Sequence, residues 1–293
     1  MSTARTAAPE IDRLVLSVNR AVGPHHGAQL QALAAEIGLD SLDMLPNLYD
    51  FLAAGRLTPE LARLRLRYAP GQAVERRLGE LRDKGLLEEW DGSTGASPVF
   101  RPLLDALATA RADVAASAWG NHPELVTTVA DAAATVASAT SDDHVVAVVH
   151  RDMPEPAEPE ARLFHRLTTL RYIRQHDHAV AWLRRHLTAE EMVAMTELWQ
   201  GENIDASHPG LTGLDGKGYT DDGSLTDKGR QVRQAIEDDT NTLAQLSFDV
   251  LEPATATALV DALRRLPSAS AYEASASRWT AFGRPHRRRR QQA

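Results

Sequence analysis

The chain of 293 residues contains no cysteine. That absence excludes disulfide bonds and thiolate metal sites, and it is compatible with a reducing compartment. Aromatic residues make up only 5% of the chain, no apolar run approaches the length of a membrane span, and the N-terminus lacks a signal-peptide core. We therefore expect a soluble, cytoplasmic protein that has no membrane partner.

Positive charge is also scarce, because 32 Lys and Arg face 40 Asp and Glu and give a net charge of −8. A dedicated nucleic-acid reader usually presents a basic face. The basic residues concentrate between residues 56 and 84, whereas acidic residues dominate from residue 190 to residue 252. Phosphates would be repelled by the acidic stretch. If the protein binds DNA, we expect the basic stretch to do so.

The composition that remains is that of a folded, mainly helical protein. Apolar residues make up 43% of the chain, and the length fits two compact domains. The Pro-rich, acidic stretch Met153–Pro159 predicts a linker. We predict an N-terminal region at 1–151, a linker at 152–160, a second unit at 161–267 and a disordered, Arg-rich tail at 268–293, whose arginines would add nonspecific affinity for nucleic acid.

Residues 56–104 read as a winged helix-turn-helix. Thr58 is suited to cap a short helix that has Pro59 at its first position, and Ala69-Pro70-Gly71 breaks it. A second helix at 71–84 follows, with Gly85 placed as its C-terminal cap. The apolar runs Leu86-Leu87 and Val99-Phe100 flank a turn-rich segment, which predicts a hairpin. Helix, turn, helix and hairpin in this order define the pattern.

The remaining elements are predicted from apolar spacing. Helices are expected at 9–22, 28–37, 42–54, 102–119, 124–139 and 160–187. Val145–Val149 is the best candidate strand outside the wings, because its apolar run is too short for a buried helix.

A second unit of the same kind is predicted further along. Thr188 and Glu191 form a capping-box pattern at the start of one helix. A Gly-rich stretch follows, and Leu225-Thr226-x-x-Gly229 then leads into a long helix that reaches Leu246. This motif resembles the end of the wing in MarR-type regulators. The predicted fold class is therefore mainly α, with tandem winged helix-turn-helix units and small β-wings, and the repetition suggests duplication.

The helix at 71–84 is the predicted recognition helix. Val74, Leu78 and Leu81 form its core face, so that Gln72 could read adenine and Arg76 guanine in the major groove of double-stranded DNA. The predicted DNA-binding residues are Gln72, Arg76, Arg77, Arg65 and Arg67. In the rival interpretation, these arginines pair with Glu75, Glu80 and the acidic second unit.

A polar row interrupts the apolar face of the helix at 160–187. Arg171, Arg174 and His178 recur at spacings of three and four residues and share one face. Three groups that can carry positive charge would suit an anionic small molecule or an acidic partner helix. The alternatives are a buried ion-pair network or a solvated face with an Arg174–Asp177 pair.

The run from Leu170 to Ala181, together with Leu225-Thr-x-x-Gly229 and Ile236-Glu237-x-x-Thr240, resembles a poorly characterised bacterial family of helix-turn-helix proteins. Its members look like tandem, MarR-related winged helices. Their Arg-x-x-Arg-Gly-Asp-Gly-His-like motif is matched here at Arg171, Arg174 and His178, whereas Gln175-His176-Asp177 replaces the Gly-Asp-Gly portion. The resemblance covers mainly residues 160–265 and implies the fold more than an activity.

Other chemistry finds little support. The pairs His25-His26 and His176/His178 are too closely spaced to face one ion together from a helix, so neither a metal nor a cofactor is expected. Gln175-x-Asp177 resembles a short polar motif of winged-helix DNA glycosylases, and no P-loop, dinucleotide fingerprint or nucleophile elbow is present.

The leading functional hypothesis is a DNA-binding transcriptional regulator of MarR-like, winged-helix type that responds to a ligand, and not an enzyme. The second is a winged-helix scaffold that binds a small molecule or a protein partner, for example in natural-product resistance. The third is a base-excising enzyme of the DNA glycosylase kind.

Overall fold

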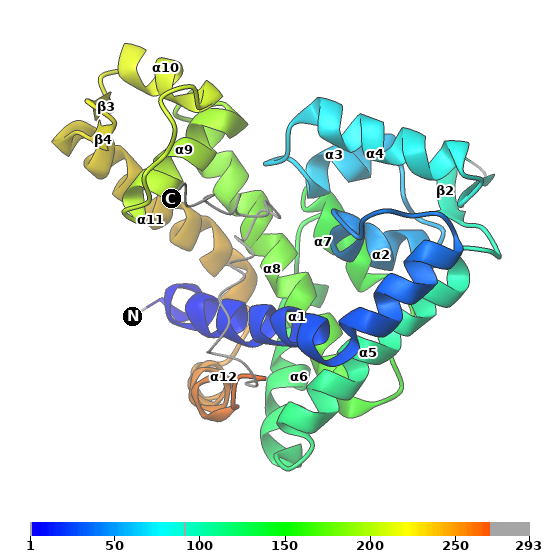
Figure 1. The fold of residues 1–293 in the computed structure, drawn as a ribbon. Helices are drawn as coiled ribbons and strands as arrows, with labels where there is room; N and C mark the ends of the chain where they lie inside the picture. The colour runs from blue at the N-terminus through cyan, green and yellow to red at the C-terminus, as the bar shows by residue number, and fades with distance from the viewer. Residues whose placement is uncertain (1, 91, 270–293) are drawn as a thin grey trace, which may run out of the picture. The chain divides into compact units, whose positions relative to one another are not determined.

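The computed structural model describes residues 2–90 and 92–269, and the predicted tail lies outside these residues except for Ser268 and Ala269 (Figure 1). The described chain is mainly helical and carries two small antiparallel strand pairs, which confirms the predicted fold class. The helices are α1 (Thr3–Glu36), α2 (Leu45–Ala53), α3 (Pro59–Arg65), α4 (Gly71–Asp83), α5 (Arg101–Trp119), α6 (Pro123–Ser138), α7 (Val145–Arg151), α8 (Pro159–Leu183), α9 (Ala189–Trp199), α10 (Pro209–Gly216), α11 (Asp227–Phe248) and α12 (Pro253–Arg265). The strands are β1 (Leu87–Trp90), β2 (Ser93–Ala96), β3 (Thr220–Asp221) and β4 (Ser224–Leu225).

The chain forms two compact units, each assembled from separated stretches of sequence. Compact unit 1 consists of Met1–Ile11, Thr128–Arg151 and Arg166–Leu263. Compact unit 2 consists of Asp12–Thr127, Asp152–His165 and the described residues from Arg264 onward. The predicted linker is non-helical from residue 152 to residue 158. The domain boundaries predicted from the sequence remain a prediction.

The N-terminal helix differs from its prediction. Instead of two helices at 9–22 and 28–37, α1 is one helix of 34 residues that passes through Pro24. A proline inside a helix removes a backbone hydrogen bond and costs about 3 kcal/mol. The apolar stripe nevertheless continues beyond it, because Leu30 and Ala34 are 3% and 1% exposed. Burial of this stripe offsets the cost of the proline.

The predicted strand at Val145–Val149 is wrong, because this segment forms α7. Its buried residues Val146, Ala147 and His150 lie at helical spacing. His150 is 1% exposed, and its Nδ1 lies 2.8 Å from the hydroxyl of Thr169 on α8. Neither of the two sheets in the described chain includes this segment. Packing against α8 therefore outweighs the β-propensity of the valines.

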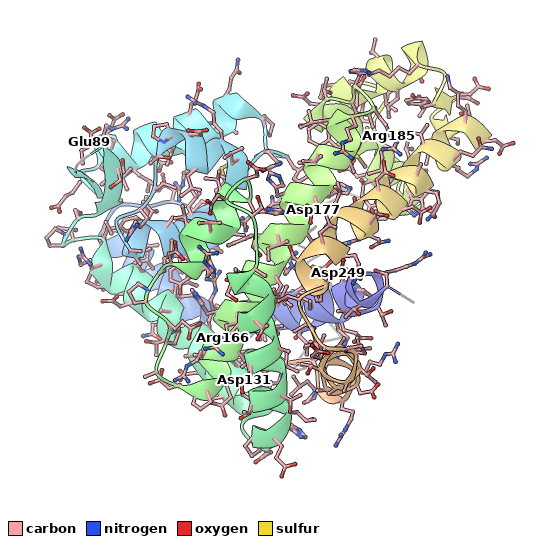
Figure 2. The ribbon with its side chains drawn as sticks, turned by 180° about the vertical axis from the view of Figure 1, so that it is seen from behind. Glu89, Asp131, Arg166, Asp177, Arg185 and Asp249 are labelled. Atoms are coloured by element: carbon pink, nitrogen blue, oxygen red, sulfur yellow. The ribbon has the colours of Figure 1, made fainter. Side chains whose placement is uncertain are left out.

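In compact unit 1, α6 and α8 are joined by a cation from α8. Arg166 lies beside Asp131 in Figure 2, with a nitrogen-to-oxygen distance of 3.6 Å, and it also donates to the backbone carbonyl of Ala130 at 3.0 Å. In compact unit 2, the end of the described chain is fixed to the helices, since the Trp119 indole donates to the carbonyl of Pro267 at 2.9 Å. Arg13 of α1 donates to the carbonyl of Leu266 at 3.0 Å.

Candidate nucleic-acid interface

The first winged helix comprises α2, α3, α4 and the hairpin β1–β2. The hydroxyl of Thr58 accepts a hydrogen bond from the backbone N–H of Leu61 at 3.0 Å, which confirms the predicted cap of α3. Leu57 pairs with Thr94 and adds a third extended segment beside the hairpin. The order of elements is the predicted helix, turn, helix and hairpin.

The hairpin itself lies earlier in the sequence than predicted. Its second strand is Ser93–Ala96 in place of Val99-Phe100, with Leu87 opposite Ala96 and Trp90 opposite Ser93. Phe100 is fully buried and precedes α5 instead. Gly95 allows this register, because a Cβ at its position would stand 3.1 Å from the Cα of Gly55. The segment predicted as the turn thus contains a strand.

Two capping hydrogen bonds end α4, the predicted recognition helix, at Gly85, which has φ +67°. The N–H of Gly85 donates to the carbonyl of Arg82 at 2.9 Å, and the N–H of Leu86 donates to the carbonyl of Leu81 at 2.9 Å. Leu81 and Leu86 are both 1% exposed, so their side chains complete a Schellman cap. The cap sets the direction in which the chain leaves α4 for β1.

The N-terminal half of α4 presents an exposed face. Gln72, Glu75 and Arg76 are exposed, and their side chains make no hydrogen bond or ion pair with any described residue. The spacing of three and four residues places Gln72 above both others on one side of the helix. These side chains are therefore available to a partner.

Three other predicted DNA-binding residues are engaged within the protein. Arg77 is 8% exposed, donates to Glu80 at 2.7 Å and to the carbonyl of Ser41 at 2.5 Å, and does not lie on the open face. Arg65 donates to the side chain of Asn47 at 2.8 Å. Arg67 donates to the carbonyl of Leu64 at 2.8 Å, and burial lowers the pKa of its guanidinium. Arg77 thus pairs with Glu80, as the rival interpretation expected, and DNA binding by Arg77, Arg65 and Arg67 stays a prediction.

Arg77 was predicted to bind DNA, although the sequence contains a signal that it is buried. It lies three residues after Val74 and four before Leu81, both of which are core residues. By contrast, Arg56 and Arg63 are exposed and make no side-chain contact of a polar kind within the described chain. They add two open cations that the sequence-based selection omitted.

The wing offers no comparable positive charge. Glu88 and Glu89 of β1 are exposed, and Glu89 lies 3.8 Å from Arg82 at the end of α4. Acidic side chains on a wing strand would repel a phosphate backbone. The open cations of the helix-turn-helix, in contrast, sit on or beside α3 and α4.

The second winged helix comprises α9, α10, the hairpin β3–β4 and the start of α11. Thr188 and Glu191 form the predicted capping box, with N···O distances of 3.2 and 2.7 Å. Thr226 caps α11 by accepting from the N–H of Gly229 at 3.0 Å. A Cβ on Gly229 would collide with the backbone of Tyr219, so the wing needs a glycine at this position. The predicted motif is confirmed in its geometry.

Helix α10 was missed because its sequence is rich in glycine. Gly210 and Gly213 let α10 approach α9 closely, since a Cβ on either would collide with the backbone of Glu190 or the side chain of Glu191. Signals for the helix were present in the sequence, namely Pro209 at its start and Gly218, with φ +68°, just after its end. Close packing with α9 offsets the low helix propensity of glycine.

The surface of this second winged helix is acidic. The sequence of α10 contains no lysine or arginine, and Asp215, Asp221 and Asp222 are exposed on α10 and its wing. Lys217, just after α10, pairs with the buried carboxylate of Glu191. The two winged helices thus share their architecture and differ in surface charge.

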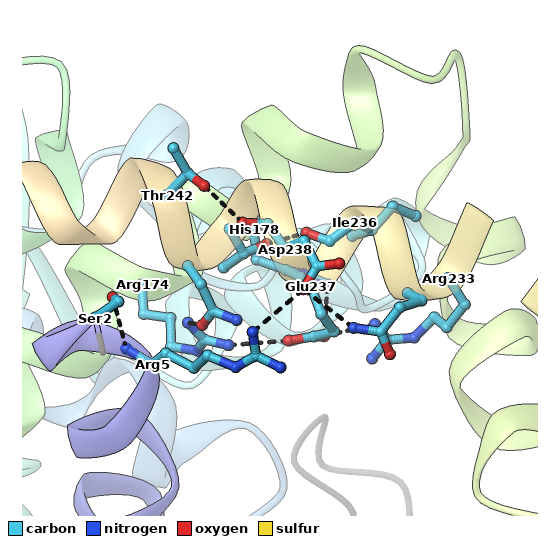
Figure 3. Close-up of polar contacts among 12 residues, drawn as sticks. Ser2, Arg5, Arg174, His178, Arg233, Ile236, Glu237, Asp238 and Thr242 are labelled. Carbon is cyan, nitrogen blue, oxygen red and sulfur yellow. Dashed lines mark hydrogen bonds and ion pairs between the residues drawn. The ribbon is translucent and has the colours of Figure 1, made fainter. Parts of the chain in front are cut away.

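The predicted anion row on α8 meets a carboxylate of its own chain. Arg174 donates to Glu237 of α11 at 2.9 Å and to Asn241 at 2.9 Å, and the Nε2 of His178 lies 3.8 Å from Glu237. Figure 3 shows Arg174 and Arg233 reaching Glu237 from either side. Burial alone would raise the pKa of Glu237, but the charges of Arg233, His178 and Arg174 hold it below its usual value.

This arrangement is the ion-pair network that was one alternative for the row. It replaces the suggested Arg174–Asp177 pair, because Asp177 lies 3.0 Å from His144 and is 4% exposed. The half-buried Arg171 also has polar or electrostatic contacts within the protein. Among the residues described, no group of three or more His, Cys, Asp or Glu side chains is arranged to hold a metal ion.

These features define a protein with two winged helix-turn-helix motifs. A model of a helix-turn-helix family matches residues 100–276, more than half of the chain. The protein belongs to this helix-turn-helix family. No curated protein and no solved structure matches the chain. In the described part of the chain, every helix is too short or too polar to cross a membrane.

Proposed function

We propose that the protein is a DNA-binding transcriptional regulator that reads double-stranded DNA with α4. The observation that carries this proposal is the open face formed by Gln72 and Arg76, whose side chains have no partner among the described residues. The amide of glutamine can hydrogen-bond to the one acceptor and the one donor that adenine presents in the major groove, and arginine can donate to the two acceptors of guanine. Membership of a helix-turn-helix family supports the proposal.

Phosphate contacts would come from the open cations around the helix-turn-helix. Arg63 on α3 and Arg56 just before it are exposed and carry no internal ion pair within the described residues. Such contacts position a protein on DNA without reading its sequence. Arg77, Arg65 and Arg67 are instead assigned to holding the winged helix together, because each donates to a neighbouring segment or turn.

The test is fluorescence anisotropy with DNA sequences selected from a random duplex library, measured over a range of salt concentrations. We expect Arg76→Ala to weaken binding to the selected sequence by about 1–3 kcal/mol. Arg82→Ala is the matched control, because Arg82 is an exposed arginine near the other end of α4 and lies 3.8 Å from Glu89. Equal binding by wild type and Arg76→Ala would remove Arg76 from the interface.

A second candidate function is a scaffold that binds a small molecule or a protein partner, and it is favoured by the acidic surface of α10 and its wing. If the wild-type protein selects no sequence and binds no duplex at physiological salt, this alternative takes the lead. The network around Glu237 argues against an anionic ligand on α8, because Arg174 already forms an ion pair with the carboxylate of Glu237.

A further inference from the structure

One acidic side chain lies within the open face of α4. Glu75 is exposed, follows Gln72 by three residues and directly precedes Arg76. Two other acidic side chains of this winged helix are paired: Glu80 with Arg77 at 2.7 Å, and Glu89 with Arg82 at 3.8 Å. The carboxylate of Glu75 has no such partner in the described chain. Its charge therefore faces any ligand of this surface.

An uncompensated carboxylate is unfavourable next to phosphates and favourable next to a hydrogen-bond donor. In the major groove of DNA, the amino group of cytosine is a donor that glutamate or aspartate can accept. A carboxylate on this helix face would thus penalise binding in any register that places it near the backbone. It would gain a charge-assisted hydrogen bond only in the register that places it at a base amino group.

We propose that Glu75 determines the sequence specificity of α4, by accepting a hydrogen bond from the amino group of a cytosine and by weakening nonspecific binding. This inference rests on the proposed function of α4 as a DNA reader. The cytosine contact of Glu75 and its weakening of nonspecific binding can be measured separately. Removal of the charge should relax the preference at one base position, and it should raise affinity for unrelated DNA.

The experiment compares wild type, Glu75→Gln and Asp83→Asn by selection from a random duplex library, followed by anisotropy on selected and unrelated duplexes. Asp83 is the matched control, because it is exposed on α4, makes no side-chain contact of a polar kind with the described residues and lies eight residues further on. Circular dichroism checks that each variant is folded.

We expect Glu75→Gln to lose about 5- to 150-fold of discrimination for cytosine at one position and to bind unrelated DNA more tightly. Asp83→Asn should keep the wild-type preference. A selective wild type whose preference is unchanged in Glu75→Gln would overturn the role of Glu75 and leave the proposed function intact. A wild type that binds no duplex would overturn the proposed function and this inference together.

Discussion

Replacing Arg111 with methionine should detach α2 from α5 in compact unit 2. Arg111 is 6% exposed and donates to the carbonyl of Pro46 at 2.7 Å. Its guanidinium lies 3.8 Å from Asp50, and its central carbon stands 4.3 Å from the centre of the Tyr49 ring. Methionine keeps much of the apolar volume of the arginine stem, so the change removes mainly the charge and its hydrogen bonds.

The expected cost follows from what the arginine leaves behind. A lost charged hydrogen bond to a carbonyl is worth about 1.5–3 kcal/mol, and a desolvated cation–π contact contributes about 2 kcal/mol. Breaking a buried ion pair by removing one partner costs about 3–5 kcal/mol, which agrees with this sum. The site disfavours negative charge, because burial and the nearby Asp50 raise the pKa of Tyr49, while Arg111 acts in the opposite direction.

Hydrogen exchange measures this cost locally, as the free energy of opening of α2. In Arg111→Met, amides of α2 should exchange several hundred-fold faster than in wild type, whereas amides of α11, in compact unit 1, should keep their rates. The double variant Arg111→Met with Asp50→Asn should recover part of the loss, because the stranded carboxylate is gone. A decrease of less than about 1 kcal/mol in the opening free energy of α2 would refute the reasoning, because removal of one partner of a buried ion pair costs more than that.

Two further predictions concern compact unit 1. Glu237→Gln should lower stability by about 1–3 kcal/mol at neutral pH. Because the folded-state pKa of Glu237 is depressed, its contribution is full above the unfolded pKa of about 4.3 and is lost as the pH falls through the lower, folded-state pKa. The thermal melts of wild type and variant should therefore draw together as the pH falls below the unfolded pKa. Persistence of the full difference at lower pH would contradict this assignment. Gly210→Ala should destabilise α10 by about 1–3 kcal/mol in a urea titration, because the new Cβ would collide with the backbone of Glu190. Gly216→Ala is the control and should be tolerated, because a Cβ at that position meets open space. Equal effects of the two substitutions would argue against close packing of α10 on α9.

Local signals in the sequence predicted the elements that depend on local chemistry. Thr58 and Thr188 were expected to cap helices, Gly85 was expected to end one, and each does so. Such caps involve atoms only a few residues apart, so the sequence contains the whole interaction. These caps placed the helix boundaries from which the helix-turn-helix pattern was predicted.

The elements that were wrong or missed depend on contacts between distant segments. The valines of α7 favour a strand, and only packing of His150 against Thr169 on α8 shows why they form a helix. The sequence around Gly210 and Gly213 predicts a loop, and only the close contact with α9 explains why it forms a helix. Tertiary packing overrides propensity in both cases.

The candidate site shows the same division. Exposure of Gln72 and Arg76 follows from the helical periodicity of α4, which the sequence displays. The partners of Arg77 and Arg65 are Ser41 and Asn47, which lie 36 and 18 residues away. No spacing rule connects such residues, so the sequence could indicate that Arg77 is buried but not which groups Arg77 and Arg65 contact.

The two winged helices also separate fold from function. Gly85 after α4 and Gly218 after α10 end their helices with the same pair of hydrogen bonds before a wing begins. Their surfaces differ, since α4 presents Arg76 and α10 presents Asp215. The family match at 100–276 covers the acidic copy and not α4, so it supports DNA binding in general, whereas the proposal that α4 reads the DNA rests on the exposed side chains of α4. If the copies arose by duplication, the glycine caps kept the architecture, whereas α10 has no lysine or arginine in place of those of α4.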